Sequence, residues 1–240
     1  MKKVCSLLLL ITLCLGLVEA AKPRVLFIGN SYTAPLKGTL TTLLDQSPHS
    51  NAELSFITKG GATLTQHLET EATIQTIQTG NWDFVVLQEQ SQTPALGGQY
   101  TASFNKAVNE LCEIIQDAGA RPVLYLTWGR RDGDARNPNL FPDFETMQGK
   151  LSKAYREAAR KNDALLAPVG EVWSAVREKD PALGKALYQK DGSHPSTKGT
   201  FLISCVFLKV LCDDPLANLT SKSVTQSEAE AITGAIDSRE

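Results

Sequence analysis

Residues 24–32, Arg24-Val-Leu-Phe-Ile-Gly-Asn-Ser-Tyr32, place a short apolar run directly before a glycine and a serine. The run Val25–Ile28, which ends at Gly29, is typical of a strand buried on both faces of a sheet. Ser31 then follows the carboxyl end of this strand, where open parallel sheets bind their ligands. The segment predicts an α/β fold with a serine at the functional edge of its sheet.

The rest of the chain alternates between strand patterns and helix patterns. Apolar runs predict further strands over Leu54–Thr58, Trp82–Leu87, Pro122–Thr127 and Ala164–Pro168. Helices are expected over Leu36–Leu44, Leu64–Gln78, Ser103–Asp117, Phe144–Lys161, Val169–Glu178, Gly199–Leu211 and Val224–Ile236. This alternation predicts a single three-layer α/β/α domain over residues 21–240, with a five-stranded parallel sheet of the flavodoxin-like kind.

The first twenty residues have the pattern of an export signal. Two lysines precede the apolar stretch Leu7–Leu17, and Val18-Glu19-Ala20 supplies small side chains for cleavage after Ala20. We therefore expect residues 1–20 to be a signal peptide and the protein to be periplasmic or secreted, with no stable membrane insertion after cleavage. Acylation at Cys14 is disfavoured, because Leu13 is large where a lipoprotein signal has a small residue.

The charge balance excludes some classes of partner. With 24 basic and 26 acidic side chains the formal net charge is −2, so we expect no nucleic-acid partner. No nucleotide-binding glycine motif is present, and three scattered histidines argue against a metal site. We expect no cofactor and no metal. The sequence leaves the oligomeric state open.

Three cysteines follow the expected signal peptide: Cys112, Cys205 and Cys212. An odd number leaves at least one thiol free or paired between chains. Cys205 and Cys212 lie two turns apart on one expected helix, about 10 Å along its axis, which is too far for a disulfide. We expect buried thiols that pack as small apolar side chains.

The segment Asp191-Gly-Ser-His194-Pro places an acid three residues before a histidine. A serine is a poor nucleophile without an adjacent base, and a histidine acts as that base when a third group orients it. Together with Ser31, this segment could supply all three groups of a serine hydrolase that acts on esters. The alternatives are that Ser31 only caps a helix and that Asp191 only shapes a turn with Gly192.

The other two histidines lie in less suggestive contexts. His49 belongs to a polar loop, Ser47-Pro-His-Ser50, and is expected to be solvated. His67 falls on the expected helix after Gly61, either at the surface or supporting the site. His194 is therefore the candidate base.

Four blocks of this chain, taken together, resemble the GDSL or SGNH hydrolases. Gly29-Asn-Ser-Tyr32 resembles the family's Gly-Asp-Ser-Leu block, and Asp191-Gly-Ser-His-Pro195 resembles its last block. Gly60-Gly-Ala-Thr63 resembles the second block, and Val85-Val-Leu-Gln-Glu-Gln-Ser91 falls where the third should be. The resemblance covers nearly the whole chain after residue 20 and implies a serine esterase.

The resemblance also assigns roles to single residues. It implies Ser31 as nucleophile, His194 as base and Asp191 as the group that orients the base. The oxyanion hole would combine the N–H groups of Ser31 and Gly61 with the Gln90 amide, where the family usually carries asparagine. Gln88 remains the alternative to Gln90 for this last role.

Trp128-Gly-Arg130-Arg131-Asp132 follows another expected strand at the same edge. One hypothesis is a polar substrate wall, in which Trp128 stacks on the substrate and Arg130 or Arg131 binds a hydroxyl or carboxylate. The other is a solvated loop with a packed tryptophan.

The polar wall and the absence of a long apolar lid favour a short acyl group, such as acetyl, on a carbohydrate. Two alternatives stay open: a lipid or thioester hydrolase of the same family, and a non-catalytic relative that binds a glycan.

Overall fold

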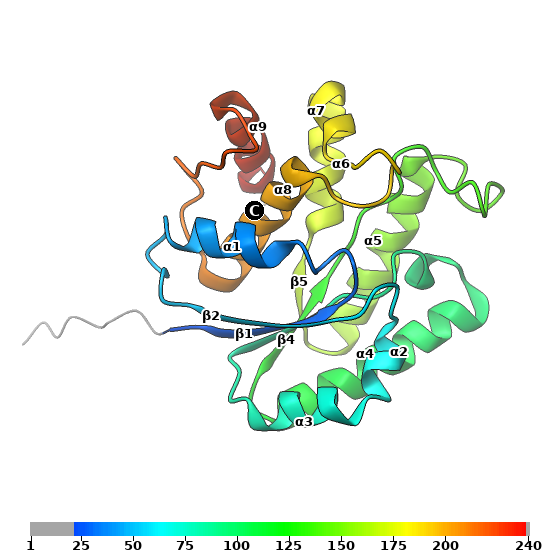
Figure 1. Cartoon of the computed structure of the whole chain (residues 1–240). Helices are drawn as coiled ribbons and strands as arrows, with labels where there is room; N and C mark the ends of the chain where they lie inside the picture. Colours follow the sequence, from blue (N-terminus) through cyan, green and yellow to red (C-terminus); the bar gives the residue numbers. More distant parts are fainter. Residues whose placement is uncertain (1–21, 239–240) are drawn as a thin grey trace, which may run out of the picture.

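The computed structural model describes residues 22–238, and its centre is a sheet of five parallel strands (Figure 1). The strand order is β2-β1-β3-β4-β5. The strands are β1 (Arg24–Gly29), β2 (Glu53–Thr58), β3 (Phe84–Leu87), β4 (Arg121–Tyr125) and β5 (Leu165–Ala167). The order reverses between β1 and β3, as in flavodoxin-like sheets. The predicted single α/β/α domain with a five-stranded parallel sheet is confirmed.

Helices cover both faces of the sheet (Figure 1). One face packs against α1 (Leu36–Leu44), α6 (Val169–Lys179), α8 (Thr197–Cys212) and α9 (Gln226–Asp237), with α7 (Pro181–Ala186) beside α6. The other face packs against α2 (Leu64–Leu68), α3 (Glu71–Thr79), α4 (Gly98–Asp117) and α5 (Phe144–Lys161). A short 3-10 turn, η1 (Thr93–Ala95), precedes α4.

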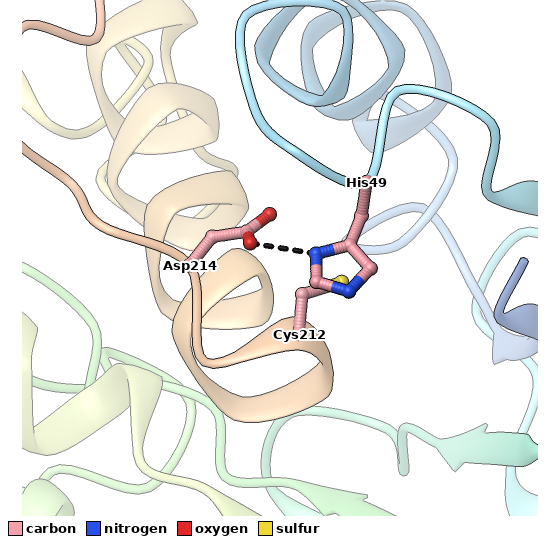
Figure 2. A group of neighbouring side chains, drawn as sticks. All are labelled: His49, Cys212 and Asp214. Carbon is pink, nitrogen blue, oxygen red and sulfur yellow. Dashed lines mark hydrogen bonds and ion pairs between the residues drawn. The ribbon is translucent and has the colours of Figure 1, made fainter. Parts of the chain in front are cut away.

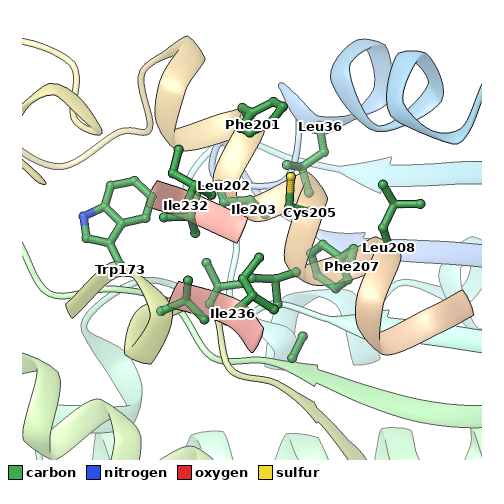
Figure 3. Packing of buried hydrophobic residues seen from close by; sticks show 14 of the residues in the cluster. Leu36, Trp173, Phe201, Leu202, Ile203, Cys205, Phe207, Leu208, Ile232 and Ile236 are labelled. Atoms are coloured by element: carbon green, nitrogen blue, oxygen red, sulfur yellow. The ribbon is translucent and has the colours of Figure 1, made fainter. Parts of the chain in front are cut away.

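Two apolar cores result from the alternation of side chains along each strand. Val25 and Phe27 of β1 belong to one core, and Leu26 and Ile28 belong to the other. This is the period of two that a β-strand imposes. Figure 3 shows the first core, where apolar residues of α8 pack with side chains from α1, α6 and α9. The central strands are covered on both faces, as their continuous apolar runs indicated.

The expected helix over Leu64–Gln78 is wrong as one element. The chain forms α2 and α3 instead, and Thr70 between them has an extended backbone, with φ −94° and ψ 104°. Thr63 begins α2 through a capping box with Gln66. Because both segments keep their apolar contacts with the same core, their spacing had the appearance of one continuous helix.

Other element boundaries also differ from the expectations. Helix α4 begins at Gly98 rather than Ser103, after Gly97 with φ 80°. Strand β3 begins at Phe84 rather than Trp82, because the Trp82 indole donates to the Thr76 carbonyl oxygen of α3. Helix α7 was not expected; Asp180 caps it by accepting from two backbone N–H groups.

The cysteines are free among the described residues. Cys112 and Cys205 are buried, one in each core, while Cys212 is partly buried at the end of α8. No helix formed within residues 22–238 has the length and apolar character needed to span a bilayer. The expected signal peptide and Cys14 lie outside the described residues.

Candidate functional site

Ser31 lies in a tight turn between β1 and α1. The N–H groups of Thr33 and Ala34 both donate to the Asn30 carbonyl oxygen, each at 3.0 Å. Helix α1 begins at Leu36, and its N-cap residue is Pro35. Ser31 is therefore not the cap of α1, and the helix-cap alternative is wrong.

His194 lies directly beside Ser31. The Ser31 Oγ to His194 Nε2 distance is 2.9 Å, and the His194 Nδ1 to Asp191 Oδ2 distance is 2.6 Å. The other carboxylate oxygen, Asp191 Oδ1, accepts from the backbone N–H groups of Ser193 and His194. Asp191 thus shapes the turn and contacts the imidazole at the same time. The structure brings the three sequence-predicted groups into one hydrogen-bonded line.

The Asp191 carboxyl has a pKa below its usual value. Burial acts to raise the pKa, but the hydrogen bonds from the His194 ring and from the N–H groups of Ser193 and His194 lower it by more. A carboxylate that is charged at neutral pH can orient an imidazole and stabilise its protonated form.

The Asp191–His194 turn is anchored from outside. Gly192 has φ 66°, and its carbonyl oxygen accepts from the Arg131 N–H at 2.8 Å. The Tyr32 hydroxyl lies 2.6 Å from Ser193 Oγ, and the Tyr32 ring meets the imidazole of His194 edge-on. The turn is therefore tied both to the loop after β4 and to the residue next to Ser31.

The backbone N–H groups of Ser31 and Gly61 have no hydrogen-bond acceptor among residues 22–238. Gly61 has φ +70°, a conformation that favours glycine. Asn30 holds the two segments together, because its Nδ2 donates to the Ala62 carbonyl oxygen and its Oδ1 accepts from the Tyr32 N–H. Both N–H groups are therefore available as donors, and their role in an oxyanion hole stays a prediction.

Gln88 and Gln90 have different surroundings. Gln88 is fully buried; its Oε1 accepts from Asn30 N and Thr33 Oγ1, and its Nε2 donates to the Glu89 carbonyl oxygen. Gln90 Oε1 accepts from the N–H groups of Gln92 and Thr93, while its Nε2 has no partner in the described part of the chain. Gln88 supports the serine turn, and the Gln90 amide retains a free donor.

Glu89 is a buried acid that sequence reasoning missed. It is 0 % exposed, and it links two loops by accepting from the N–H groups of Gln90 and Leu64. Burial raises its pKa to about 7, against the lowering effect of these two hydrogen bonds. The available signal was an acid two residues after the apolar run Val85–Leu87, and this signal does not distinguish a buried acid from an exposed one. Glu89 holds the Gly61 loop against the end of β3.

His67 and His49 both have specific partners. His67 is buried, and its Nε2 donates to the carbonyl oxygen of Gly29, just before the serine turn. Burial lowers the His67 pKa, which favours the neutral ring. The expectation of a solvated His49 is wrong, because its Nδ1 lies 2.6 Å from Oδ1 of the buried Asp214.

Trp128 does not belong to a substrate wall. It is 0 % exposed, and its ring stacks on Trp173 and Tyr32, with centroid distances of 4.2 and 4.6 Å. Its indole N–H donates to the Ser193 carbonyl oxygen. The expectation that Trp128 stacks on substrate is therefore wrong. The Trp128 ring is buried in the core, and its indole supports the turn that carries His194.

The two arginines lie beside the Asp191 turn. A cavity of ≈ 280 Å³ is lined by Arg130, Asp134, Asp191, Gly192 and neighbouring residues of the loop after β4. Arg130 pairs with Asp134, and Arg131 pairs with Asp132. The structure therefore places a cavity of mixed polar and apolar lining beside the Asp191 turn, with Arg130 in its wall.

One solved structure is similar enough to decide the family. A protein from Slackia heliotrinireducens, named as an SGNH hydrolase, is 31% identical to this chain with a TM-score of 0.65. The match covers 79% of this chain and 99% of that one. The chain belongs to the SGNH hydrolase family. No family model matches the sequence, and no curated protein does.

Other solved structures share the fold at lower identity. A DUF4886 family protein from Bacteroides uniformis has a TM-score of 0.72 at 16% identity, covering 89% of this chain and 92% of that one. An acetyl xylan esterase has a TM-score of 0.62 at 16% identity, covering 78% and 98%. At these identities the likeness shows the fold alone, and it is the SGNH hydrolase fold.

Proposed function

We propose that this SGNH hydrolase is an exported serine esterase that removes short acyl groups, acetyl foremost, from a carbohydrate. The observation that carries the proposal is the hydrogen-bonded line from Ser31 Oγ through His194 to Asp191, with distances of 2.9 and 2.6 Å. Nucleophile, base and orienting acid recur in this geometry in serine hydrolases of unrelated folds. Export rests on the signal pattern of residues 1–20.

The first half of the reaction follows from these contacts. His194 Nε2 takes the proton of the Ser31 hydroxyl as Oγ attacks the acyl carbon, and Asp191 stabilises the resulting imidazolium through Nδ1–H. The tetrahedral oxyanion accepts from the free N–H groups of Ser31 and Gly61 and from Gln90 Nε2. Each such donor is typically worth about 3 kcal/mol of barrier. His194 then protonates the leaving alkoxide, and the sugar hydroxyl departs.

The second half returns the enzyme to its starting state. Water attacks the acyl group on Ser31 while His194 takes a proton from it. The Ser31–acyl bond breaks, the acid leaves, and the proton on His194 returns to Ser31 Oγ. Every proton that is moved comes from Ser31 or from water and ends on the leaving alcohol or on Ser31 Oγ, so the cycle needs no cofactor.

The small size of the cavity beside the Asp191 turn, and the charged side chains in its wall, support a short acyl group on a polar alcohol. The cavity of ≈ 280 Å³ is lined by Arg130 and by three aspartates, together with apolar residues that include Phe141 and Pro142. The SGNH-like neighbours include proteins named acetyl xylan esterase. Arg130 offers guanidinium donors to sugar hydroxyls at the cavity wall.

Hydrolysis of p-nitrophenyl acetate and release of acetate from acetylated xylan test the proposal. Ser31→Ala should lose activity by orders of magnitude, while Ser227→Ala, an exposed serine on α9, should retain it. Faster turnover of long-chain esters than of acetyl esters would identify a lipid hydrolase instead. Inactivity of the unsubstituted protein on both substrates, with retained binding of xylan, would identify a glycan-binding relative.

A further inference from the structure

A second cluster of chemically active side chains lies away from the serine site: His49, Cys212 and Asp214 (Figure 2). His49 comes from the loop between α1 and β2, Cys212 is the last residue of α8, and Asp214 follows that helix. One ligand atom from each residue lies within 4.8 Å of the others. The three side chains point toward one another and represent the imidazole, thiolate and carboxylate donors that zinc prefers.

The backbone at the end of α8 brings two of these groups together. Asp213 is the C-cap of the helix and has the left-handed conformation, with φ 53° and ψ 30°. This single residue turns the chain, so Cys212 and Asp214 on either side of it reach the same point.

The loop that carries His49 is held in place independently of the cluster. Gln46 Nε2 donates to the Thr220 carbonyl oxygen, and Gln46 Oε1 accepts from the Thr220 N–H at 3.0 Å. The His49 carbonyl oxygen accepts from the Ala52 N–H. Both segments of the cluster are therefore positioned by bonds that do not involve its side chains.

The carboxylate of Asp214 is only half satisfied. Asp214 is 2 % exposed, its Oδ1 lies 2.6 Å from His49 Nδ1, and its Oδ2 is buried with no hydrogen-bond partner among residues 22–238. A buried acceptor without a partner is rare and points to a missing ion or water. Here the unpartnered oxygen sits in a cluster that also contains a thiol and an imidazole.

We propose that His49, Cys212 and Asp214 bind a Zn²⁺ ion. The charges balance, because one thiolate and one carboxylate neutralise the divalent ion while the imidazole stays neutral. On binding, the proton of the neutral His49 ring moves from Nδ1 to Nε2, and the Cys212 thiol releases its proton to solvent. The ion then contacts His49 Nδ1, Cys212 Sγ and the Asp214 carboxylate, in which Oδ2 also gains a cation as its partner. With metal–ligand bonds of about 2.1 Å, tetrahedral geometry needs an N···O separation of about 3.4 Å, so the present pair has to open on binding.

The fourth ligand position faces solvent. A cavity of ≈ 400 Å³ is lined by His49 and Cys212 together with Pro23, Asp83 and Arg121. A water molecule can therefore complete the coordination.

The same cavity places the cluster relative to the sheet. Pro23 and Asp83 precede β1 and β3, and Arg121 begins β4. The cluster thus lies at the amino ends of the strands, at the edge opposite Ser31. We infer a structural ion that ties the His49 loop to the end of α8.

Metal titration of the full chain, purified in a non-chelating reductant and stripped with a chelator, tests the inference. One Zn²⁺ should bind per chain and raise Tm, with proton release seen by calorimetry in buffers of different ionisation enthalpy. Co²⁺ in place of Zn²⁺ should produce the near-ultraviolet charge-transfer band of a thiolate ligand. The absence of this band from the unsubstituted protein would overturn the proposal without recourse to a variant.

Matched substitutions assign the ligands. Cys212→Ser and Asp214→Asn should each weaken Zn²⁺ binding by about 10- to 100-fold or more. Asp213→Asn, which changes the exposed neighbour, and Cys112→Ala, which removes a thiol in the other core, should leave it unchanged. Equal binding by Cys212→Ser and Cys112→Ala would overturn the site. Ester hydrolysis should be the same with and without the ion.

Discussion

Ser31 Oγ lies 2.9 Å from His194 Nε2, although 163 positions separate the two residues along the chain. Ser31 follows β1, whereas His194 belongs to a turn that precedes α8. The Tyr32 hydroxyl bonds Ser193, so the residues next to the serine and the histidine are joined as well. The close approach is thus built into the packing of two loops and does not depend on a single contact.

Asp191→Asn should reduce kcat by roughly 100- to 10,000-fold with little change in KM, because the amide cannot hold the imidazole as the carboxylate does. Steady-state hydrolysis of an acetyl ester measures the effect. Asp117→Asn is the control, since Asp117 is exposed at the end of α4, away from the serine. Equal losses in the two variants would contradict the role of Asp191.

Gln90→Glu tests the amide donor of Gln90 separately from its acceptor oxygen. Glutamate retains an oxygen for the N–H groups of Gln92 and Thr93 but has no amide donor for an oxyanion. We expect kcat to fall by about 100-fold or more with Tm nearly unchanged. Full activity would remove Gln90 from the proposed oxyanion hole.

Gln88→Leu should lower the free energy of unfolding, in addition to any effect on catalysis. The substitution leaves the buried Asn30 N–H and the Thr33 hydroxyl without their acceptor, at a cost of about 1–3 kcal/mol for each group. Urea unfolding should show the loss. An unchanged midpoint would mean that Gln88 does not support the serine turn.

Glu89 should make stability depend on pH. Its pKa in the folded protein is raised from 4.5 to about 7. The protonated Glu89 carboxyl therefore makes its full contribution to the free energy of unfolding below about pH 4.5. This contribution is lost as the pH rises from 4.5 through 7, and in alkaline solution the loss amounts to about 3 kcal/mol. Glu89→Gln should remove this dependence, so its stability relative to the unsubstituted protein should improve from pH 5 to pH 8. If the free energies of unfolding of the two proteins, measured with urea, changed in the same way with pH, this result would contradict the raised pKa of Glu89.

Two glycines should respond oppositely to alanine. A Cβ at Gly29 would lie 2.6 Å from Gln88 Oε1 inside the buried serine turn, so Gly29→Ala should destabilise the fold and reduce activity. Gly38 lies in α1 with no atom within 4 Å of an added Cβ. Gly38→Ala should raise stability by about 0.5–1 kcal/mol. Thermal unfolding of both variants checks the pair, and destabilisation by Gly38→Ala would contradict the open surroundings of that site.

The sheet could be predicted well because its signals are local. A strand that is covered on both faces needs a continuous apolar run such as Val25–Ile28. This local pattern was therefore enough to predict the strand. The same holds for α1 and α5, whose ends lie where the sequence placed them. The break at Thr70 was missed because α2 and α3 bury the same face against one core, and apolar spacing does not report a change of direction.

The sequence was enough to predict which residues carry the chemistry of the candidate site, but not which side chains contact and support them. Ser31, Asp191 and His194 stand in short motifs whose chemistry can be read directly. Glu89 and Trp128 cannot be assigned in this way, since a buried acid and a buried indole have the same sequence appearance as exposed ones. Their roles depend on what packs around them.

The sequence by itself determined the parallel α/β sheet and the edge at which the serine would lie, because burial of a central strand and the direction of the chain follow from local pattern. Tertiary structure alone decided which polar groups are partnered. It placed Trp128 in the core and gave hydrogen-bond partners to both the oxygen and the nitrogen of the Gln88 amide. It also brought His49 beside Cys212 and Asp214, although 165 positions separate His49 from Asp214. The reason is physical: hydrogen bonding and burial depend on the distance between groups in space, which the order of residues along a chain does not specify.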